Sequence, residues 1–531
     1  MKDLKSLPSA PFSTPPVEFP YPTVTQPAST ALFSDGTRLG RLAMAAAVVA
    51  LGLVALTGVL GPSAAVVPLP RGPFPLGASL HPSAWLVTVL LAAAVGLSVL
   101  ATATGWAALR KAWAPSPTRF LAAGIVAAGL LAAVPPVGGA DVLSYAAYGH
   151  IADQGRDPYA VRPSSLTDPF ARAVEDPWRS TPSVYGPLAT AEQALVVRLS
   201  GGDLRLAVGL LDVVNAAAFA AAGWLLFLLA GSDDDRRRRA VLAFGGNPVL
   251  LFAVVAGAHV DALAVVAVVG ALGLLGGRPG AGARGDEEGP EPPWGRAWWA
   301  GVVAGAGVLV KLTAGLPVAG WAWLLERSGR RRQAVAVAAG AVAASAAGYL
   351  GTGLHALAQA RRASSFVSVG TPWRPIRSVL QAIAGHGVAG AVVAAGSLAV
   401  TILLAVRLAR GLPEVDPADR VAEAARAGLV VALAWTLAAP YVLAWYDAVP
   451  WALAALHPVS RYHRILLVHT GMLALAYLPG RVVALPPGLG GATTVLRSAV
   501  SPLVLGVLLI VAFTGSPQRP VGTWGRPSRR R

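Results

Sequence analysis

Long apolar segments separated by short polar ones fill most of this 531-residue chain. A membrane-spanning helix needs about twenty consecutive, mostly apolar residues. The segments that meet or approach this length are 40–60, 84–106, 119–136, 206–230, 334–350, 387–408, 427–444, 462–478 and 498–514. The pattern therefore predicts an all-α polytopic membrane protein.

Other apolar segments carry polar or helix-breaking residues near their middle. They are 240–277, with Asn247-Pro248 and then His259 and Asp261; 297–326, broken around Gly315-Leu316-Pro317; and 435–457, divided at Trp445-Tyr446-Asp447. We expect each to form two shorter helices that meet at these residues, because interrupted helices are tolerated in a membrane only where protein or water surrounds the break. With these splits the chain has about 12–14 transmembrane or re-entrant helices.

One polar island, from Val137 to Arg205, interrupts this apolar pattern and carries eight of the 26 acidic residues. It is predicted to be a large extracytoplasmic loop that contains short helices. Asp141 follows the end of an apolar segment within a few residues, so its carboxylate is a candidate catalytic base. The alternative is that Asp141 only caps the following helix, because aspartate at an N-cap accepts backbone N–H bonds.

The composition agrees with a membrane protein: 55% of the residues are hydrophobic and 13% are charged. The chain has no cysteine, which excludes disulfides and thiolate metal sites. The net charge of +17 is best explained by basic cytoplasmic loops that orient the protein, and we expect no nucleic-acid partner.

The basic clusters all fall on one side of the membrane if every predicted split is real, and that side is the cytoplasm. The polar island, the His259 and Asp261 corner, a loop at 351–385 and the Trp445 corner then converge on the extracytoplasmic side, so an outward-facing cavity is expected. The predicted organisation is a disordered cytoplasmic tail (1–37), N-terminal transmembrane helices (38–136), an extracytoplasmic catalytic loop (137–205), a transmembrane core (206–514) and a basic cytoplasmic tail (515–531).

His259, Asp261 and Lys311 are ionisable residues within apolar surroundings, where such groups are costly and usually functional or paired. His259 and Asp261 offer too few ligands for a metal site, so no metal is predicted. Lys311 is one of the few lysines in the chain, and either extends to the membrane interface or neutralises a lipid phosphate from the cavity wall.

The predicted loop at 351–385 contains four arginines: Arg361, Arg362, Arg374 and Arg377. They lie on the extracytoplasmic side, which should be poor in basic residues. Guanidinium groups bind phosphate with two hydrogen bonds, which a lipid-phosphate substrate would supply. The alternative is contact with anionic lipid headgroups.

Seven short motifs follow one another in an order that is more specific than any one of them. They are Asp-Val-x-Ser-Tyr-Ala-x-x-Gly (Asp141 to Gly149), Gly-x-Asp-Pro-Tyr (Gly155 to Tyr159), Trp178, Tyr-Gly-Pro-Leu (Tyr185 to Leu188), Asn-Pro with Ala-His-x-Asp-Ala-Leu (Asn247 to Leu263), Val-Lys-Leu-Thr (Val310 to Thr313) and Pro-Tyr-Val-x-x-Trp-Tyr (Pro440 to Tyr446). This order resembles the actinobacterial polyprenyl-phosphomannose-dependent alpha-1,6-mannosyltransferases, which are membrane glycosyltransferases of the GT-C class. In one respect the chain departs from the class: Asp141 follows the third apparent span rather than the first, which implies two added N-terminal helices.

The resemblance implies transfer of mannose from a polyprenyl-phosphate-mannose donor to the 6-hydroxyl of a lipid-anchored, lipomannan-type alpha-1,6-mannan, at an extracytoplasmic site in the cell membrane and without a cofactor. It makes Asp141 the base that deprotonates the acceptor. The leaving phosphate would be stabilised by Lys311, Arg361, Arg362, Arg374, Arg377 and His259. Sugar or lipid contacts would come from Tyr145, Tyr148, Tyr159, Trp178, Tyr185, Asp261, Trp445 and Tyr446.

Two alternatives remain at this point. A transporter or flippase for a lipid-linked sugar would share the cavity and its basic and aromatic residues, but needs no base. Another GT-C transferase would use a different sugar or a protein acceptor.

Overall fold

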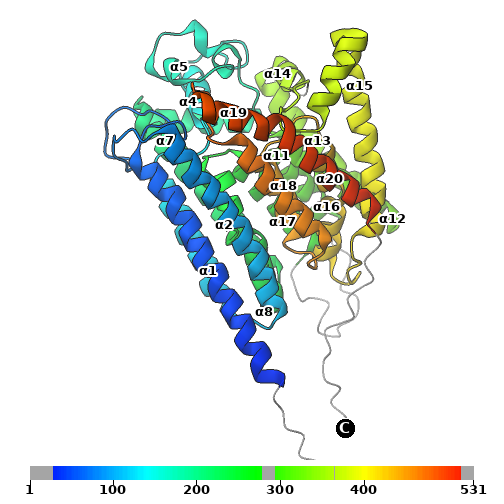
Figure 1. Ribbon diagram of the computed structural model, residues 1–531. Helices are drawn as coiled ribbons and strands as arrows, with labels where there is room; N and C mark the ends of the chain where they lie inside the picture. The colour runs from blue at the N-terminus through cyan, green and yellow to red at the C-terminus, as the bar shows by residue number, and fades with distance from the viewer. Residues whose placement is uncertain (1–27, 278–293, 364, 516–531) are drawn as a thin grey trace, which may run out of the picture.

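The structure is a computed structural model that describes residues 28–277, 294–363 and 365–515 (Figure 1). Throughout these ranges the regular structure is helical, and no strand is present. The all-α prediction is therefore confirmed. The predicted terminal tails lie mostly outside the described residues, and so does part of the basic segment between Arg278 and Arg296.

The first helices are α1 (Ala28–Leu60), α2 (Ala84–Arg110) and α3 (Pro117–Ala132). Ser83 caps α2 by accepting from the Leu86 N–H, and Pro117 opens α3. Helix α1 begins inside the segment predicted as a tail, since residues 28–37 are helical. Three apolar helices precede Asp141, as the sequence predicted.

The polar island folds into short helices joined by turns. They are α4 (Asp141–Asp153), η1 (Pro163–Ser165), α5 (Pro169–Ala173), η2 (Trp178–Ser180) and α6 (Pro187–Leu199). Helices α4 and α6 pack so closely that a Cβ on Gly149 would lie 2.4 Å from the Gln193 carbonyl oxygen. The two helices therefore form a packed unit, and their buried side chains belong to the main apolar core.

The predicted helix breaks are present. The first split segment consists of α8 (Asp234–Ala240), η3 (Val241–Gly245), α9 (Pro248–Leu250), η4 (Leu251–Ala256) and α10 (Asp261–Gly276). The second split segment consists of α11 (Trp294–Val308), η5 (Leu312–Gly315) and α12 (Leu316–Arg327). The third consists of α16 (Arg420–Ala438), η6 (Ala444–Asp447) and α17 (Ala448–Ala454). In the second, the chain leaves α11 at Val308, several residues before the predicted position. Lys311 is extended there, with φ −151° and ψ 125°.

The remaining elements are α7 (Leu204–Leu229), α13 (Arg331–Thr352), α14 (His355–Ala363), α15 (Trp373–Gly411), α18 (Arg461–Tyr477), α19 (Pro487–Val495), η7 (Leu496–Val500) and α20 (Ser501–Thr514). Helix α15 is kinked at Gly385, whose φ of +79° is easily adopted only by glycine.

Eight helices in the described part of the chain are long and apolar enough to cross a membrane, and α3 and α10 are shorter apolar helices. The protein is thus a polytopic membrane protein. In Figure 1, α4, α5 and α14 lie at one end of the bundle, whereas the start of α1 and the arginine-rich α8 lie toward the other.

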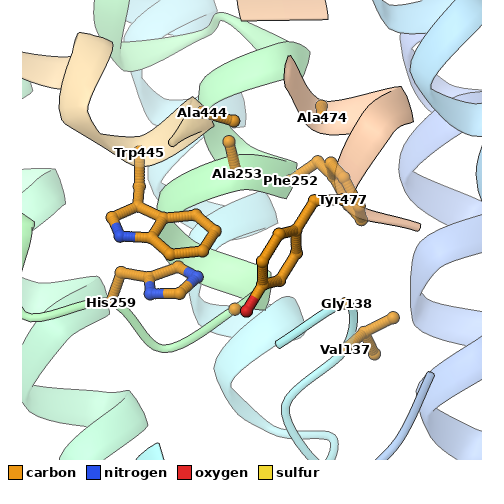
Figure 2. A pocket seen from close by; sticks show the side chains of 10 residues that line it. Val137, Gly138, Phe252, Ala253, His259, Ala444, Trp445, Ala474 and Tyr477 are labelled. Atoms are coloured by element: carbon orange, nitrogen blue, oxygen red, sulfur yellow. The ribbon is translucent and has the colours of Figure 1, made fainter. Parts of the chain in front are cut away.

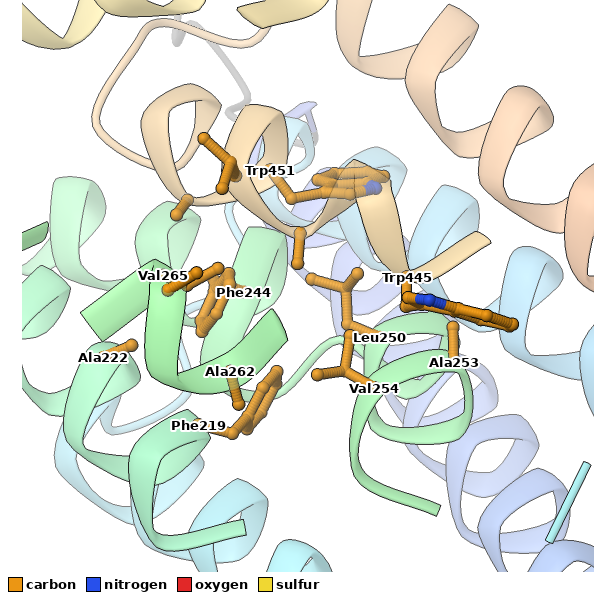
Figure 3. Close-up of a cluster of buried hydrophobic side chains, with 14 of the residues drawn as sticks. Phe219, Ala222, Phe244, Leu250, Ala253, Val254, Ala262, Val265, Trp445 and Trp451 are labelled. Carbon is orange, nitrogen blue, oxygen red and sulfur yellow. The ribbon is translucent and has the colours of Figure 1, made fainter. Parts of the chain in front are cut away.

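Close packing of small and aromatic side chains forms the core between these helices (Figure 3). Phe219 of α7 stacks on Phe244 of η3 with ring centroids 4.7 Å apart. A Cβ on Gly124 of α3 would lie 2.1 Å from the Gly245 carbonyl oxygen, so these backbones meet directly. Small residues permit such contacts where lipid supplies no hydrophobic driving force.

Candidate functional site

Four polar stretches that are far apart in the sequence line one cavity of about 260 Å³. Asp141 comes from the start of α4, Tyr185 from the loop before α6, Lys311 from the break before η5, and Trp445 and Tyr446 from η6. Of the four stretches predicted to converge, the polar island, the 351–385 loop through Phe366 and the Trp445 corner line this opening, whereas the His259 and Asp261 corner does not. The rest of the lining is Trp178, Val184, Gly186, Val310, Leu312, Thr313, Tyr349, Phe366, Trp435, Ala439, Pro440, Tyr441, Leu443 and Tyr477.

Backbone contacts hold the start of α4 against the His259 corner. The Val137 N–H donates to the Ala256 carbonyl at 2.6 Å, and the Gly138 N–H donates to Ala65 at 2.8 Å. Gly138 has a φ of +79°, which lets the chain turn into α4 at this point. The turn places Asp141 beside the end of η4.

No side chain among the described residues donates a hydrogen bond to the Asp141 carboxylate. The N-cap position of α4 belongs to Ala140, where no side chain caps the helix. His259 Nδ1 lies 3.6 Å from Asp141 Oδ2, beyond hydrogen-bond distance. The capping alternative is thus not supported, and the carboxylate oxygens are available to a ligand.

Burial raises the pKa of the Asp141 carboxyl to about 6. The Lys311 ammonium opposes this effect, while the Asp261 and Glu175 carboxyls add to it. A carboxylate with this pKa is still mostly ionised at neutral pH, yet is a stronger base than an exposed aspartate.

Lys311 faces the same cavity and is held by two partners. Its Nζ donates to Asp261 Oδ1 at 2.6 Å and lies 3.5 Å from the centroid of the Tyr446 ring. The pair is largely buried, with 13% of the Lys311 side chain and 7% of the Asp261 side chain exposed. Asp261 therefore pairs with the cation instead of lining the cavity.

The loop that carries Tyr185 is attached to the Lys311 break through the backbone. The Gly186 N–H donates to the Val310 carbonyl at 3.1 Å, and the Leu188 N–H donates to Leu309 at 2.9 Å. A Cβ on Gly186 would lie 2.1 Å from the Leu309 carbonyl oxygen, so only glycine fits this contact. The attachment holds Tyr185 and Lys311 on the wall of the same cavity.

Side chains of α18 hold the η6 corner through a buried polar cluster. Asp447 Oδ2 accepts from Thr470 Oγ1 at 2.6 Å and lies 2.8 Å from His469 Nδ1, both on α18. Figure 2 shows the neighbouring Trp445 lying flat on the His259 ring, with centroids 3.5 Å apart and planes 13° from parallel. Tyr477 packs edge-on against Trp445 at 5.0 Å.

The predicted sugar and lipid contacts divide into two groups. Trp178, Tyr185, Trp445 and Tyr446 line the cavity, and Tyr145 packs edge-on behind Tyr185. Two others lie outside the lining and bond to protein: Tyr148 donates to the Thr181 carbonyl, and the Tyr159 hydroxyl pairs with Thr190.

The four predicted phosphate-binding arginines do not line the cavity. Three are exposed, and Arg377 is partly buried. They occupy α14 and the first turns of α15: Arg361 and Arg362 on the former, Arg374 and Arg377 on the latter. His259, with 1% of its side chain exposed, is likewise outside the lining.

Sequence patterns did not reveal Tyr349, Phe366 and Tyr477, which line the cavity from α13, the loop before α15 and the end of α18. Tyr349 and Tyr477 are isolated aromatic residues at the ends of apolar segments, which is also where membrane-interface aromatics occur, and Phe366 is an isolated aromatic residue in a polar loop. No local signal distinguishes the two cases. Across the described residues, no group of three or more His, Cys, Asp or Glu side chains could hold a metal ion.

Comparison with known proteins identifies the family. The sequence profile of the alpha-(1->6)-mannopyranosyltransferase N-terminal domain matches residues 39–327, just over half of the chain. The chain belongs to the alpha-(1->6)-mannopyranosyltransferase family. The match spans Asp141, His259, Asp261 and Lys311, and it confirms the resemblance that the motifs suggested.

Curated members of the alpha-(1->6)-mannopyranosyltransferase family align over shorter segments. One from Mycobacterium tuberculosis is 30% identical over 132 residues, which cover 24% of this chain and 22% of that protein. Alpha-(1->6)-mannopyranosyltransferase B of Corynebacterium glutamicum is 28% identical over 185 residues, which cover 33% of this chain and 29% of that protein. The alignments thus span less than a third of either relative.

Among solved structures, the chain is similar to an archaeal oligosaccharyltransferase, AglB from Archaeoglobus fulgidus, in complex with an inhibitory peptide and a dolichol-phosphate. The identity is 14% and the TM-score 0.31, covering 75% of this chain and 56% of that one. A second structure of the Archaeoglobus fulgidus oligosaccharyltransferase, in complex with zinc and sulfate, has a sequence identity of 13% and a TM-score of 0.33. Likeness at this level carries no argument about the site.

Proposed function

We propose that this protein is an inverting GT-C mannosyltransferase that moves mannose from polyprenyl-phosphate-mannose to the 6-hydroxyl of a lipid-anchored alpha-1,6-mannan on the extracytoplasmic side of the cell membrane. Family membership supports mannosyl transfer. The observation that carries the proposal is the free Asp141 carboxylate on the wall of the cavity that also holds the Lys311 ammonium.

In this mechanism the acceptor hydroxyl oxygen attacks the anomeric carbon while the bond from that carbon to the phosphate oxygen breaks. Asp141 accepts the hydroxyl proton, so the attacking oxygen develops no full positive charge. The electron pair of the broken bond stays with the polyprenyl phosphate. Attack on the face opposite the phosphate inverts the configuration.

Lys311 is the cation that meets the leaving phosphate in this proposal. Positive charge fixed where negative charge develops lowers the barrier, and does so most effectively where water is excluded. Asp261 and the Tyr446 ring hold the ammonium in place before the donor arrives. The aromatic side chains of Trp178, Tyr185 and Trp445 offer flat faces to a sugar ring or a prenyl chain.

The four arginines are given a different role. Because they lie outside the cavity lining, the proposal assigns the leaving phosphate to Lys311 alone. Contact with anionic lipid headgroups, the alternative that the sequence left open, fits the exposed positions of Arg362 and Arg374.

The proposal is tested with purified protein in lipid nanodiscs, labelled polyprenyl-phosphate-mannose and a short alpha-1,6-linked mannoside. We expect the label to enter the mannoside, and linkage analysis to find a new alpha-1,6 bond. Another linkage or sugar would indicate a different GT-C transferase. Donor binding without any glycosidic product, together with donor movement across vesicle membranes, would indicate a transporter and contradict the proposal.

A further inference from the structure

His259 lies behind the cavity wall rather than on it. Its ring stacks on Trp445, and Tyr477 packs edge-on against Trp445 beside this stack (Figure 2). With 1% of the side chain exposed and no place in the cavity lining, the imidazole cannot reach a donor phosphate in this structure. A different role is needed for a buried polar ring in an apolar setting.

The ring is confined by its own chain segment and by the turn before α4. A Cβ on Gly257 would lie 2.5 Å from the imidazole, and one on Gly139 would lie 3.2 Å from Nε2. These two glycines give the ring its space between η4 and the turn before α4. A side chain at either position would displace the imidazole.

The backbone of this corner is anchored from α7. Asn215, which is buried, donates from Nδ2 to the Ala258 carbonyl at 3.1 Å. Ala258 has a φ of +53°, a conformation that costs free energy in a residue other than glycine. The Asn215 hydrogen bond stabilises this strained residue directly before His259.

The Nδ1 nitrogen of the ring faces Asp141. His259 Nδ1 is buried and makes no hydrogen bond within the described residues, and it lies 3.6 Å from Asp141 Oδ2. A movement of a few tenths of an ångström closes this gap to a hydrogen bond, and such contacts are often long before substrate binds.

We infer that His259 is a positioning residue that acts through Asp141: its Nδ1–H binds Oδ2 and leaves the other carboxylate oxygen to accept the proton of the acceptor hydroxyl. The inference rests on the proposed function. It replaces the donor-phosphate role that the sequence suggested for this histidine.

The charge state of the imidazole suits this role. Burial, reinforced by the Lys311 ammonium, lowers the pKa of His259 well below its ordinary value, so the ring is neutral at working pH. A neutral donor orients the carboxylate without reducing its basicity as a cation would. The charged groups that face Asp141 are then Lys311, Asp261 and Glu175.

Two substitutions separate orientation from packing. His259→Phe keeps a flat ring on Trp445 but removes Nδ1, whereas His259→Asn keeps a polar group near the Nδ1 position. The same substitutions at the exposed His386 on α15 are matched controls. For each variant we measure donor affinity, kcat and the pH profile of transfer, with donor affinity also reporting that the protein is folded.

We expect His259→Phe to lower kcat by about 10- to 100-fold, the range that a misplaced catalytic group produces, with donor affinity unchanged. Loss of the polar neighbour also destabilises the ionised carboxylate, so the acid limb of the pH profile moves to higher pH. His259→Asn should recover part of both effects. Unchanged kcat and pH profile in His259→Phe would overturn the inference, and so would weakened donor binding with kcat retained, because that result marks a phosphate ligand.

Failure of the inference differs from failure of the proposed function. If the wild-type protein binds donor but forms no mannoside, the proposed function is wrong and His259 has no base to position. If wild type is active and Asp141→Asn is inactive while His259→Phe behaves as His386→Phe, only the positioning role is wrong.

Discussion

Asp141 combines two properties that local sequence sets in different ways. Its place at the end of an apolar segment is visible in the sequence, and it predicted a carboxylate at the membrane edge. Its freedom from capping depends on the turn at Gly138, which puts Ala140 rather than Asp141 at the N-cap. A side chain one residue earlier would have been held by backbone N–H groups.

The raised pKa of Asp141 predicts how transfer depends on pH. The base works when ionised, so activity should be constant above a pKa of about 6 and fall as pH drops below it. The decline should approach about tenfold per pH unit, as expected for one proton. Measuring kcat/KM between about pH 4.5 and 8 checks this, and a profile that is flat over this whole range would mean that burial does not raise the pKa of Asp141.

Among single residues, the sequence predicted Lys311 and Asp261 as functional but could not pair them. Ionisable side chains in apolar segments are rare enough to stand out, whereas their contact spans fifty positions and depends on how α10 packs near η5. The arginines show the opposite limit. Their charge is evident in the sequence, but the paths of α14 and of the start of α15, which keep them off the cavity wall, are not.

At the scale of elements, the Lys311–Asp261 pair links α10 to the break before η5. Lys311→Met leaves the Asp261 carboxylate buried without its cation, and breaking such a pair costs about 3–5 kcal/mol of unfolding free energy. The double variant with Asp261→Asn removes both charges and should be more stable than Lys311→Met alone. Thermal unfolding in detergent measures this order. Equal stability of the single and double variants would show that the pair is not a buried contact.

The contact between the Tyr185 loop and the Lys311 break gives a second prediction at this scale. Gly186→Ala puts a methyl group 2.1 Å from the Leu309 carbonyl oxygen, so the two segments must separate and Tyr185 must move away from Lys311. We expect transfer to fall by about 100-fold, as for a catalytic group displaced by an ångström. Gly129→Ala on α3 meets no atom within 4 Å and is the control. Wild-type transfer by Gly186→Ala would contradict the packing.

The helix breaks were predictable because proline or paired polar residues in the middle of an apolar run commonly mark the point where a membrane helix is interrupted. Their positions were less certain, as the early end of α11 at Val308 illustrates. The kink at Gly385 was not foreseen, since glycine is common within transmembrane helices and one more carries no signal.

At the scale of the whole molecule, the proposed function requires the polar island and the connection between α12 and α13 to lie on opposite sides of the membrane. The chain has no native cysteine, so single substitutions can report sidedness. Ser164→Cys in the island and Ser328→Cys after α12 replace exposed serines. In intact cells a membrane-impermeant thiol reagent should label the first and not the second. The reverse pattern would place the cavity in the cytoplasm.

The central claim, that one carboxylate serves as the base for mannosyl transfer, is tested most directly by Asp141→Asn. This variant keeps the shape of the side chain but cannot accept the proton. Its matched control is Asp153→Asn on the same helix, where the lost ion pair with the exposed Arg198 contributes little. With labelled polyprenyl-phosphate-mannose and a short mannoside, Asp141→Asn should bind donor normally and transfer at least about 100-fold more slowly, while Asp153→Asn matches wild type. Equal incorporation of label by Asp141→Asn and wild type would contradict the account.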